Sequence, residues 1–62
     1  MWKRVLEFCA WVATRAWRYG YSKAKAAIAW AKANYTTVYR WIERGISFGT
    51  IVEWILQILG LS

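Results

Sequence analysis

The chain has no histidine, no aspartate and no proline, and Cys9 is its only cysteine. A zinc site without histidine would need carboxylates and a single thiolate, which is an unusual set of ligands. A nucleophilic cysteine needs a base beside it, and no histidine is present to act as one. A glycine-rich phosphate-binding loop is also missing. We therefore expect no enzyme activity, no cofactor and no metal, and we expect Cys9 to be a small buried apolar residue.

Negative charge is also scarce. Glu7, Glu43 and Glu53 are the only acids, against nine lysines and arginines, and the net charge is +6. All nine bases precede Gly45, so residues 45–62 are almost uncharged. A basic body with an apolar end indicates an anionic partner, which is either nucleic acid or a lipid head-group surface.

Apolar residues are abundant. They make up 60% of the chain, against a usual value of about 45–50%, and six of them are tryptophans. A chain of this length buries only about 60% of the surface that its unfolded form exposes. Some large apolar side chains must therefore face outward, as they do at binding surfaces.

Neither end of the chain predicts a transmembrane or targeting segment. The apolar run over residues 45–60 is shorter than the roughly 20 residues that span a bilayer, and Glu53 lies near its middle. The basic N-terminal segment lacks the uninterrupted apolar stretch of a signal peptide, because Glu7, Arg15 and Arg18 interrupt it. We therefore expect neither a simple membrane anchor nor a cleaved signal peptide.

Glycines divide the chain into helices. Gly20, Gly45 and Gly60 each follow a helical pattern, at the position where a residue with left-handed backbone ends a helix. Asn34 is expected to act in the same way, and no stretch alternates long enough to predict a strand. The pattern predicts helices over residues 2–18, 22–33, 36–44 and 47–59. The expected fold class is all-α: a single domain over residues 1–62, built as a compact bundle of four short amphipathic helices.

Candidate caps stand at three of the predicted helix starts. Ser22 is expected to cap the second helix, and Thr36 or Thr37 the third. Thr50 and Glu53 match a capping box, which would let the last helix proper begin at Thr50 after a looser turn.

The first predicted helix has two faces, which follow from a rotation of roughly 100° per residue. The expected core stripe comprises Trp2, Val5, Leu6, Cys9, Ala13 and Ala16. The expected solvent-facing stripe comprises Arg4, Phe8, Trp11, Arg15 and Arg18. Aromatic rings beside guanidinium groups are favourable at a bilayer interface, where they meet head groups and phosphates. The alternative is that Phe8 and Trp11 pack on another helix.

The other predicted helices each carry an apolar stripe. In the second helix it comprises Ala24, Ala27, Ile28, Trp30 and Ala31. In the third it comprises Val38, Trp41 and Ile42, with Tyr39, Arg40, Glu43 and Arg44 facing out. In the last it comprises Phe48, Ile51, Val52, Ile55, Ile58 and Leu59, with Trp54 at an exposed edge.

The last helix is apolar nearly all round, so we expect it to be the core element that packs against the other three. The side chains expected to be mostly buried across the bundle are Trp2, Val5, Leu6, Cys9, Val38, Trp41, Ile42, Ile51, Ile55 and Ile58.

Residues 23–44 suggest an alternative, a DNA-binding helix-turn-helix, because "AKANYTTVYRWIERG" is similar to the second half of such motifs. If Val38 holds the apolar position of a recognition helix, the turn glycine should fall at Lys32 and a small residue at Ile28. Both positions depart from the motif, which is a weak signal by itself. The DNA-contacting residues in this alternative are Tyr39, Arg40 and Arg44.

Several short segments, taken in order, carry a resemblance to a known family. They are Tyr19-Gly20, Ser22-Lys23-Ala24, Ala29-Trp30-Ala31, Trp41-Ile42, Gly45, Ser47-Phe48 and Gln57-Ile58-Leu59-Gly60. With this order and spacing the chain resembles the leaderless bacteriocins of the aureocin and lacticin type. The start, Met1-Trp2 with Arg4 and Leu6, is similar to some members, so the resemblance covers nearly the whole chain. A looser likeness to circular bacteriocins extends over residues 36–60.

The resemblance implies a saposin-like helical bundle that is secreted without a leader and keeps Met1. It also implies killing of Gram-positive bacteria by membrane disruption, without a protein receptor. The last helix of the family usually carries several lysines, whereas Trp54 and Leu56 stand here where bases are expected. Membrane attraction must then come from the first three helices. We expect a monomer in water, with self-association on the membrane left open.

The expected functional site is therefore a surface that binds anionic lipid. Bases are attracted to such a surface by about 1 kcal/mol each, and Trp2, Trp11, Trp17 and the tyrosines would anchor the protein at the interface. The last helix would then exchange protein contacts for acyl chains, which costs little because both are apolar. The residues expected to bind the membrane are Lys3, Arg4, Phe8, Trp11, Arg15, Trp17, Arg18, Lys23, Lys25, Lys32, Arg40, Arg44 and Trp54.

Overall fold

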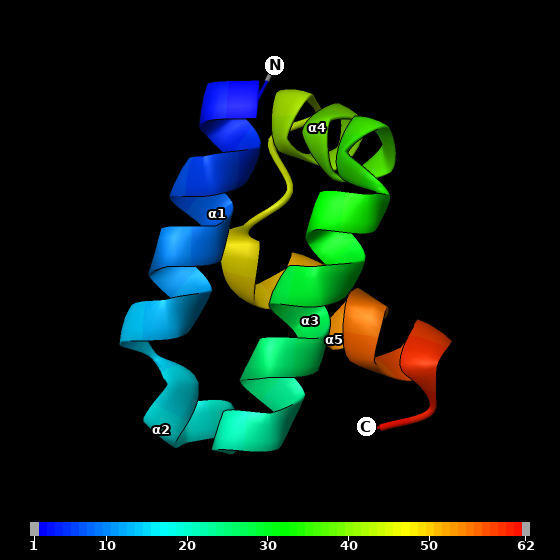
Figure 1. Ribbon diagram of the computed structural model, residues 1–62. Coiled ribbons are helices and arrows are strands. Elements are labelled where there is room, and N and C mark those ends of the chain that lie inside the picture. Colours follow the sequence, from blue (N-terminus) through cyan, green and yellow to red (C-terminus); the bar gives the residue numbers. More distant parts are fainter. Residues whose placement is uncertain (1, 62) are drawn as a thin grey trace.

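A computed structural model describes residues 2–61, and over that range the chain is helical, with no strand (Figure 1). Its elements are α1 (Trp2–Thr14), α2 (Ala16–Tyr19), α3 (Tyr21–Ala33), α4 (Tyr35–Glu43) and α5 (Phe48–Leu59). The helices pack into a bundle with a Cα radius of gyration of 10.3 Å. The expected all-α bundle is confirmed for the described residues.

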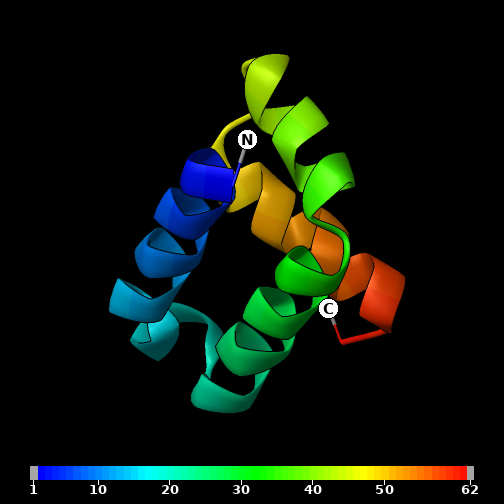
Figure 2. The ribbon, with the colours of Figure 1, turned by 45° about the horizontal axis from the view of Figure 1, so that its top comes forward.

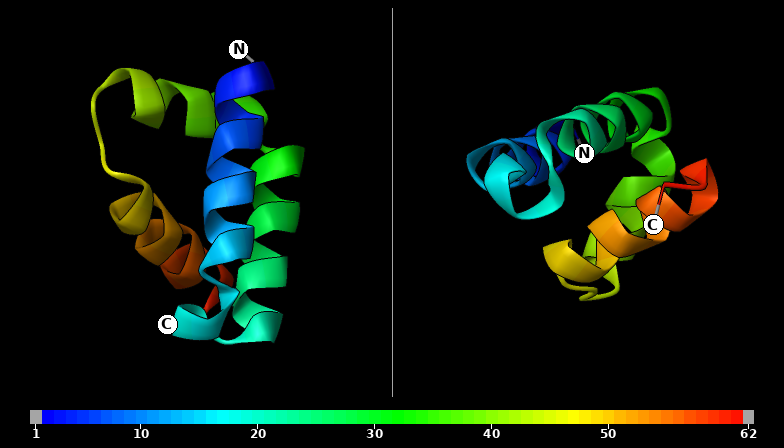
Figure 3. Two further views of the ribbon diagram at one scale, coloured as in Figure 1. Left: turned by 90° about the vertical axis from the view of Figure 1, so that its left-hand side faces the viewer. Right: turned by 90° about the horizontal axis from the view of Figure 1, so that it is seen from below.

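The helices form two layers. α1 and α3 run antiparallel beside each other, and α5 lies behind them (Figures 1 and 3). α4 crosses one end of the bundle, next to the start of α1 (Figure 2). α5 packs against α1, α3 and α4. This confirms the expectation that the last helix contacts the other three predicted helices.

The first helix is shorter than predicted. Instead of continuing over residues 2–18 it breaks at Arg15, where the backbone has φ −116° and ψ 21°. The amide of Arg15 donates to the carbonyl of Val12 at 3.0 Å, which is the tighter spacing of a helix end. The break ends α1 after 13 residues, which is also the length of α3, the helix beside it. The chain then turns back through α2.

The helix starts also differ from the prediction. α3 begins at Tyr21, after Gly20, and the expected Ser22 cap does not form. α5 begins at Phe48 rather than Thr50, because the Ser47 hydroxyl accepts a hydrogen bond from the Thr50 amide at 3.3 Å. Ser47 is therefore the N-cap of α5.

α3 and α4 meet at one residue, Asn34. α4 begins directly after it, so neither Thr36 nor Thr37 is a cap. Asn34 has φ −123°, not the expected left-handed backbone, and its side-chain amide instead donates to the Trp30 carbonyl at 3.0 Å. The expectation of positive φ is confirmed at the three glycines, Gly20, Gly45 and Gly60.

One apolar core joins α1, α3, α4 and α5. Its buried members are Val5, Phe8, Cys9, Val12, Ala24, Ala27, Ala31, Val38, Ile51, Val52, Ile55 and Leu56. The alanines on α3 let α1 and α5 approach closely, while branched side chains from the other helices fill the remaining space.

The buried side of α1 differs from the prediction. Phe8, expected to face outward, has no exposed surface, whereas Trp2 and Leu6, expected in the core, are 46% and 43% exposed. At roughly 100° per residue the buried stripe is displaced by about 60° from the expected one. The reason is the position of α5, whose Phe48 ring meets the Phe8 ring edge to face at 5.4 Å.

Among the other side chains expected to be buried, Val5, Cys9, Val38, Ile51 and Ile55 are confirmed. Trp41 and Ile42 are half-buried. The prediction is wrong for Ile58, which is 56% exposed. The last turn of α5 projects beyond α3 (Figure 1), and Ile58 is the residue before the end of that helix.

Candidate functional site

The predicted solvent-facing stripe of α1 is only partly exposed. Arg4 and Arg18 lie on the surface, but Trp11 and Arg15 are half-buried and Phe8 belongs to the core. The alternative that the two aromatic residues pack on another helix is therefore right for Phe8 and largely right for Trp11. Phe8 cannot contact a membrane while the bundle keeps this packing.

Trp11 and Arg15 are held in a local cluster. The Trp11 ring meets the Phe48 ring edge to face, with centroids 5.8 Å apart. The guanidinium carbon of Arg15 lies 4.4 Å from the centroid of the Trp11 ring, in cation–π geometry. The same guanidinium also donates to the Thr14 hydroxyl at 3.2 Å. These two side chains therefore have partners inside the protein.

Next to this cluster lies an open hollow of about 640 Å³, which is lined by residues of α1, α2 and the start of α5. Its lining is Trp11, Arg18, Tyr19, Ser47, Gly49 and Glu53. Because Glu53 contributes a carboxylate, this side of the molecule is less favourable to an anionic surface than its arginines alone suggest.

Three tryptophans connect α3, α4 and α5. Trp30 stacks on Trp41 with centroids 6.0 Å apart and an interplanar angle of 8°. Trp41 in turn meets Trp54 edge to face at 5.1 Å. All three are half-buried, so Trp54 does not stand at an exposed edge as predicted. Their rings contribute to packing, and only part of each is available to a partner.

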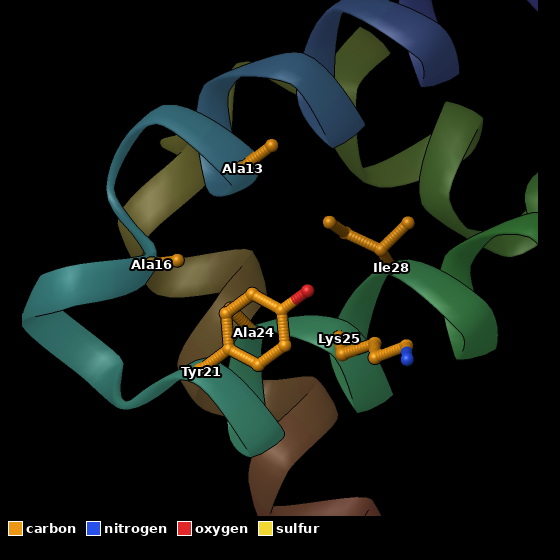
Figure 4. Close-up of a pocket in the computed structure, with 6 residues that line it drawn as sticks. All are labelled: Ala13, Ala16, Tyr21, Ala24, Lys25 and Ile28. Carbon is orange, nitrogen blue, oxygen red and sulfur yellow. The ribbon is translucent and has the colours of Figure 1, made fainter.

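The side of α1 and α3 that faces away from α5 carries an apolar surface between the two helices (Figure 4). A pocket of about 160 Å³ lies in it, lined by Ala13, Ala16, Tyr21, Ala24, Lys25 and Ile28. Helical spacing continues the same sides toward α4, through Leu6 and Trp2 on α1 and Lys32 on α3. The Trp2 and Tyr35 rings meet edge to face at 5.3 Å and close that end. We call this surface the outer groove.

The turn through α2 carries the two most exposed aromatic side chains, Trp17 at 80% and Tyr21 at 75%. Arg18 lies 6.0 Å from the Trp17 ring, as its guanidinium carbon to the ring centroid. Trp17 thus matches its predicted exposure. The remaining basic residues of the predicted site, Lys3, Lys23, Lys25, Lys32, Arg40 and Arg44, are also exposed.

Some surface residues were absent from the sequence-based site. Leu6 was assigned to the core, and Tyr21 and Tyr35 were expected at an interface only as members of the tyrosines in general. The signal for Leu6 was its place in an apolar stripe with Trp2 and Ala13. The sequence predicts that this stripe is buried, because periodicity identifies an apolar side of a helix. It does not identify the element that covers that side.

Among residues 2–61, two groups have pKa values that depart from the ordinary ones. Burial raises the pKa of the Cys9 thiol, and the positive charge of Lys32 partly opposes this rise. The pKa of Tyr39 is raised chiefly by the hydrogen bond that its hydroxyl donates to Glu43 at 3.1 Å, and the charge of Arg4 lowers it. Arg4, Tyr39, Ile42 and Glu43 together line an open pocket of about 260 Å³.

The geometry of α3 and α4 does not match a helix-turn-helix. Such motifs join their two helices by a turn of about three or four residues, whereas only Asn34 separates α3 from α4. Val38 is fully buried, and the Tyr39 hydroxyl is hydrogen-bonded to Glu43. The arrangement offers no specific support for DNA binding.

Two features are absent from residues 2–61. No cluster of cysteine and carboxylate side chains with the makings of a metal site is present there. None of the helices in this range is both long enough and apolar enough for a bilayer-spanning segment.

A known protein is similar to this chain over most of its length. No family model matches the chain, and no solved structure matches it. The chain is 37% identical over 43 residues to Bacteriocin BacSp222 from Staphylococcus pseudintermedius, an alignment that covers 69% of this chain and 86% of that protein. With this identity over most of the relative's length, the chain belongs to the family of bacteriocins that includes Bacteriocin BacSp222.

Proposed function

We propose that the protein is a secreted antibacterial peptide that binds the anionic membrane of Gram-positive bacteria and permeabilises it. The support for antibacterial action is its membership of a bacteriocin family. The support for a lipid target is the surface, where exposed bases lie among exposed aromatic side chains on a chain of net charge +6. No chemical step is part of this function.

The observation that carries the proposal is the exposure of large apolar side chains on so basic a protein. Trp2, Leu6, Trp17 and Tyr21 are each more than two-fifths exposed. Such side chains are unfavourable in water but favourable at a bilayer interface, where indole and phenol rings settle beside head groups. Several bases attracted by about 1 kcal/mol each would hold the protein at an anionic bilayer before any apolar side chain inserts.

Permeabilisation follows from the small core. Lipid tails are as apolar as the residues around α5, so the exchange of protein contacts for acyl contacts changes the free energy little. Phe8, buried in the bundle, would meet lipid only after such an opening. Opening would also release the Trp30–Trp41–Trp54 cluster, which joins the three helices involved.

We further propose that, within the bacteriocins, the protein belongs to the leaderless class of the aureocin and lacticin type. This assignment rests on the order of short segments from Tyr19 to Gly60 and includes export without a signal peptide and retention of Met1, a residue outside the described range. In this proposal the protein is a monomer in water, and no receptor protein takes part.

Dye release from lipid vesicles tests the proposal. The protein should release dye from phosphatidylglycerol-rich vesicles and largely spare phosphatidylcholine vesicles at low salt, and it should kill a Gram-positive indicator strain. Salt should weaken the preference, because the Debye length falls from about 30 Å at 0.01 M to about 8 Å at 0.15 M. The part of vesicle binding that depends on apolar insertion should remain at the higher salt concentration. Sequence-specific binding of duplex DNA at physiological salt, without vesicle leakage, would favour the helix-turn-helix function instead.

A further inference from the structure

The outer groove is an apolar surface without a partner in the monomer. α5 covers the opposite side of α1 and α3, and no helix within residues 2–61 covers this one (Figures 1 and 4). Leu6 on α1 is 43% exposed and Tyr21 on α3 is 75% exposed. With the pocket between them, the two helices present an apolar strip about 20 Å long, the length of 13 helical residues.

The charges beside this strip are positive. Lys25 is the only charged side chain that lines the pocket, among the residues that the structure describes. Lys32 lies on the same side of α3, seven residues further on, and is close enough to lower the pKa of Cys9. Glu43 and Glu53 line the other two pockets. At roughly 100° per residue, Glu7 points about 100° or more away from the side of α1 that carries Leu6.

We propose that the outer groove is the face by which the protein docks on an anionic bilayer, with α1 and α3 lying along the surface. Lys25 and Lys32 meet lipid phosphates, and Leu6 and Tyr21 enter the interfacial layer. The inference rests on the proposed membrane function and identifies the surface that performs its first step.

Charge favours a bilayer over a second copy of the chain as the partner of the outer groove. Two copies paired through this groove would bring together two molecules of net charge +6 and set their Lys25 and Lys32 side chains against one another. Like charges placed opposite each other across an interface oppose association. A phosphatidylglycerol surface instead offers negative charge and an apolar layer at the depth that the groove residues reach.

The side of α1 that carries Trp11 and Arg15 is the less suitable face. Arg15 already lies over the Trp11 ring and donates to the Thr14 hydroxyl, so contact with lipid would have to replace these interactions. The hollow beside it contains Glu53. The outer groove has neither drawback.

Two lysines on α3 give a matched test by charge. Lys23 and Lys25 are both exposed, but their spacing of two residues places them on different sides of the helix. Lys25→Gln should weaken partitioning into phosphatidylglycerol vesicles about fivefold at 0.15 M salt, the equivalent of about 1 kcal/mol. Lys32→Gln should have a similar effect.

Lys23→Gln, with the same change in net charge, should weaken partitioning less than twofold. Lys23 lies on another side of the same helix, which is about 10–12 Å across with its side chains. This width exceeds the Debye length of about 8 Å at this salt, so the charge of Lys23 is partly screened from lipid at the groove. Equal losses for Lys23→Gln and Lys25→Gln would overturn the docking face.

A second matched pair tests the apolar contact. Leu6 on the groove and Ile58 at the end of α5 have comparable exposure, 43% and 56%. Leu6→Ser should reduce partitioning about fivefold or more, because it removes an apolar side chain that enters the interface. Ile58→Ser should reduce the binding that precedes leakage less than twofold, because α5 meets acyl chains only after the bundle opens. Thermal unfolding of both variants checks that the bundle is intact, and a larger loss with Ile58→Ser would overturn the proposal.

The failure of this inference is distinguishable from failure of the proposed function. If the unaltered protein neither binds nor leaks phosphatidylglycerol vesicles, the membrane function itself is wrong. If it leaks them and the matched pairs behave alike, only the docking face is wrong. If sedimentation shows a dimer that Leu6→Ser dissociates while partitioning is unchanged, the groove binds a second copy and the docking proposal is overturned.

Discussion

Two sides of α1 are similarly apolar and yet have different environments. One side, with Val5, Phe8 and Val12, is completely buried against α5 and its neighbours. The other, with Trp2 and Leu6, remains more than two-fifths exposed along the outer groove. The difference shows that an apolar stripe acquires its role from the element that covers it. On a chain too small to cover every stripe, one of them is left for a partner.

The largest expected effect is a difference in the free energy of unfolding between substitutions on the two sides of α1. Phe8→Ala should reduce the free energy of unfolding by about 3–5 kcal/mol, because it leaves a cavity in a tightly packed core. Leu6→Ala should reduce it by less than about 1 kcal/mol, since part of that side chain already contacts water. Urea unfolding monitored by circular dichroism measures both. Equal losses would mean that the outer groove is closed in solution.

A tryptophan pair sharpens the comparison. Trp11→Ala should reduce the free energy of unfolding by about 1–2 kcal/mol, since it removes the aromatic contact with Phe48 and the cation–π contact with Arg15. Trp2→Ala, with only one edge contact to Tyr35, should reduce it less and should weaken vesicle partitioning more. Thermal unfolding and vesicle titration of the two variants decide between these roles. The reverse order would assign the lipid contact to Trp11.

Cys9 lies between the two sides of α1. The rate at which its thiol is alkylated tests the position of Lys32, with a smaller expected effect. Its thiol has a raised pKa because of burial, so alkylation by iodoacetamide should be slow at neutral pH, where little thiolate is present. Lys32→Gln removes a charge that lowers this pKa, so alkylation should slow by a further small factor. Lys23→Gln is the matched control and should leave the rate unchanged. An equal effect of both variants would place Lys32 away from the groove.

The smallest expected effect concerns the side of α1 that carries Arg4, where Tyr39 donates a hydrogen bond to Glu43. The folded state raises the Tyr39 pKa and so favours the protonated phenol. This contribution is complete below the pKa of the unfolded chain, near pH 10, and is lost as pH rises through the folded value. Ultraviolet titration should show the Tyr39 phenol ionising above its ordinary pKa. Tyr39→Phe should remove that ionisation step and the matching alkaline loss of stability.

The positions of the helix ends show where sequence reasoning was reliable. Gly20, Gly45 and Gly60 were recognised as helix ends because their positive φ is unfavourable for residues with a side chain. The break at Arg15 was missed, since no glycine or proline marks it. The break lies where the chain leaves α1 and turns back toward α3, and the packing of α1 on α3 is a tertiary contact that periodicity does not report.

The candidate site also contains some features that the sequence predicts and others that depend on tertiary contacts. The scarcity of acids, the exposed bases and the exposure of Trp17 followed from composition and pattern. The burial of Phe8 and the half-burial of Trp11, Arg15 and Trp54 did not, because each depends on a ring contributed by another helix. Sequence periodicity identifies which residues share a side of a helix but carries no information about which helix lies against that side.

By itself the sequence determined that the protein is helical, basic and too apolar for its size, and that several large side chains would remain on its surface. Helix propensity, glycine positions and charge are local properties, so they can be read residue by residue. Only the tertiary structure decided which surface remained. α5 is apolar nearly all round and α1 is apolar on two sides, so more than one docking arrangement satisfies the pattern. Close packing against Phe8 selected one of them and left the outer groove uncovered.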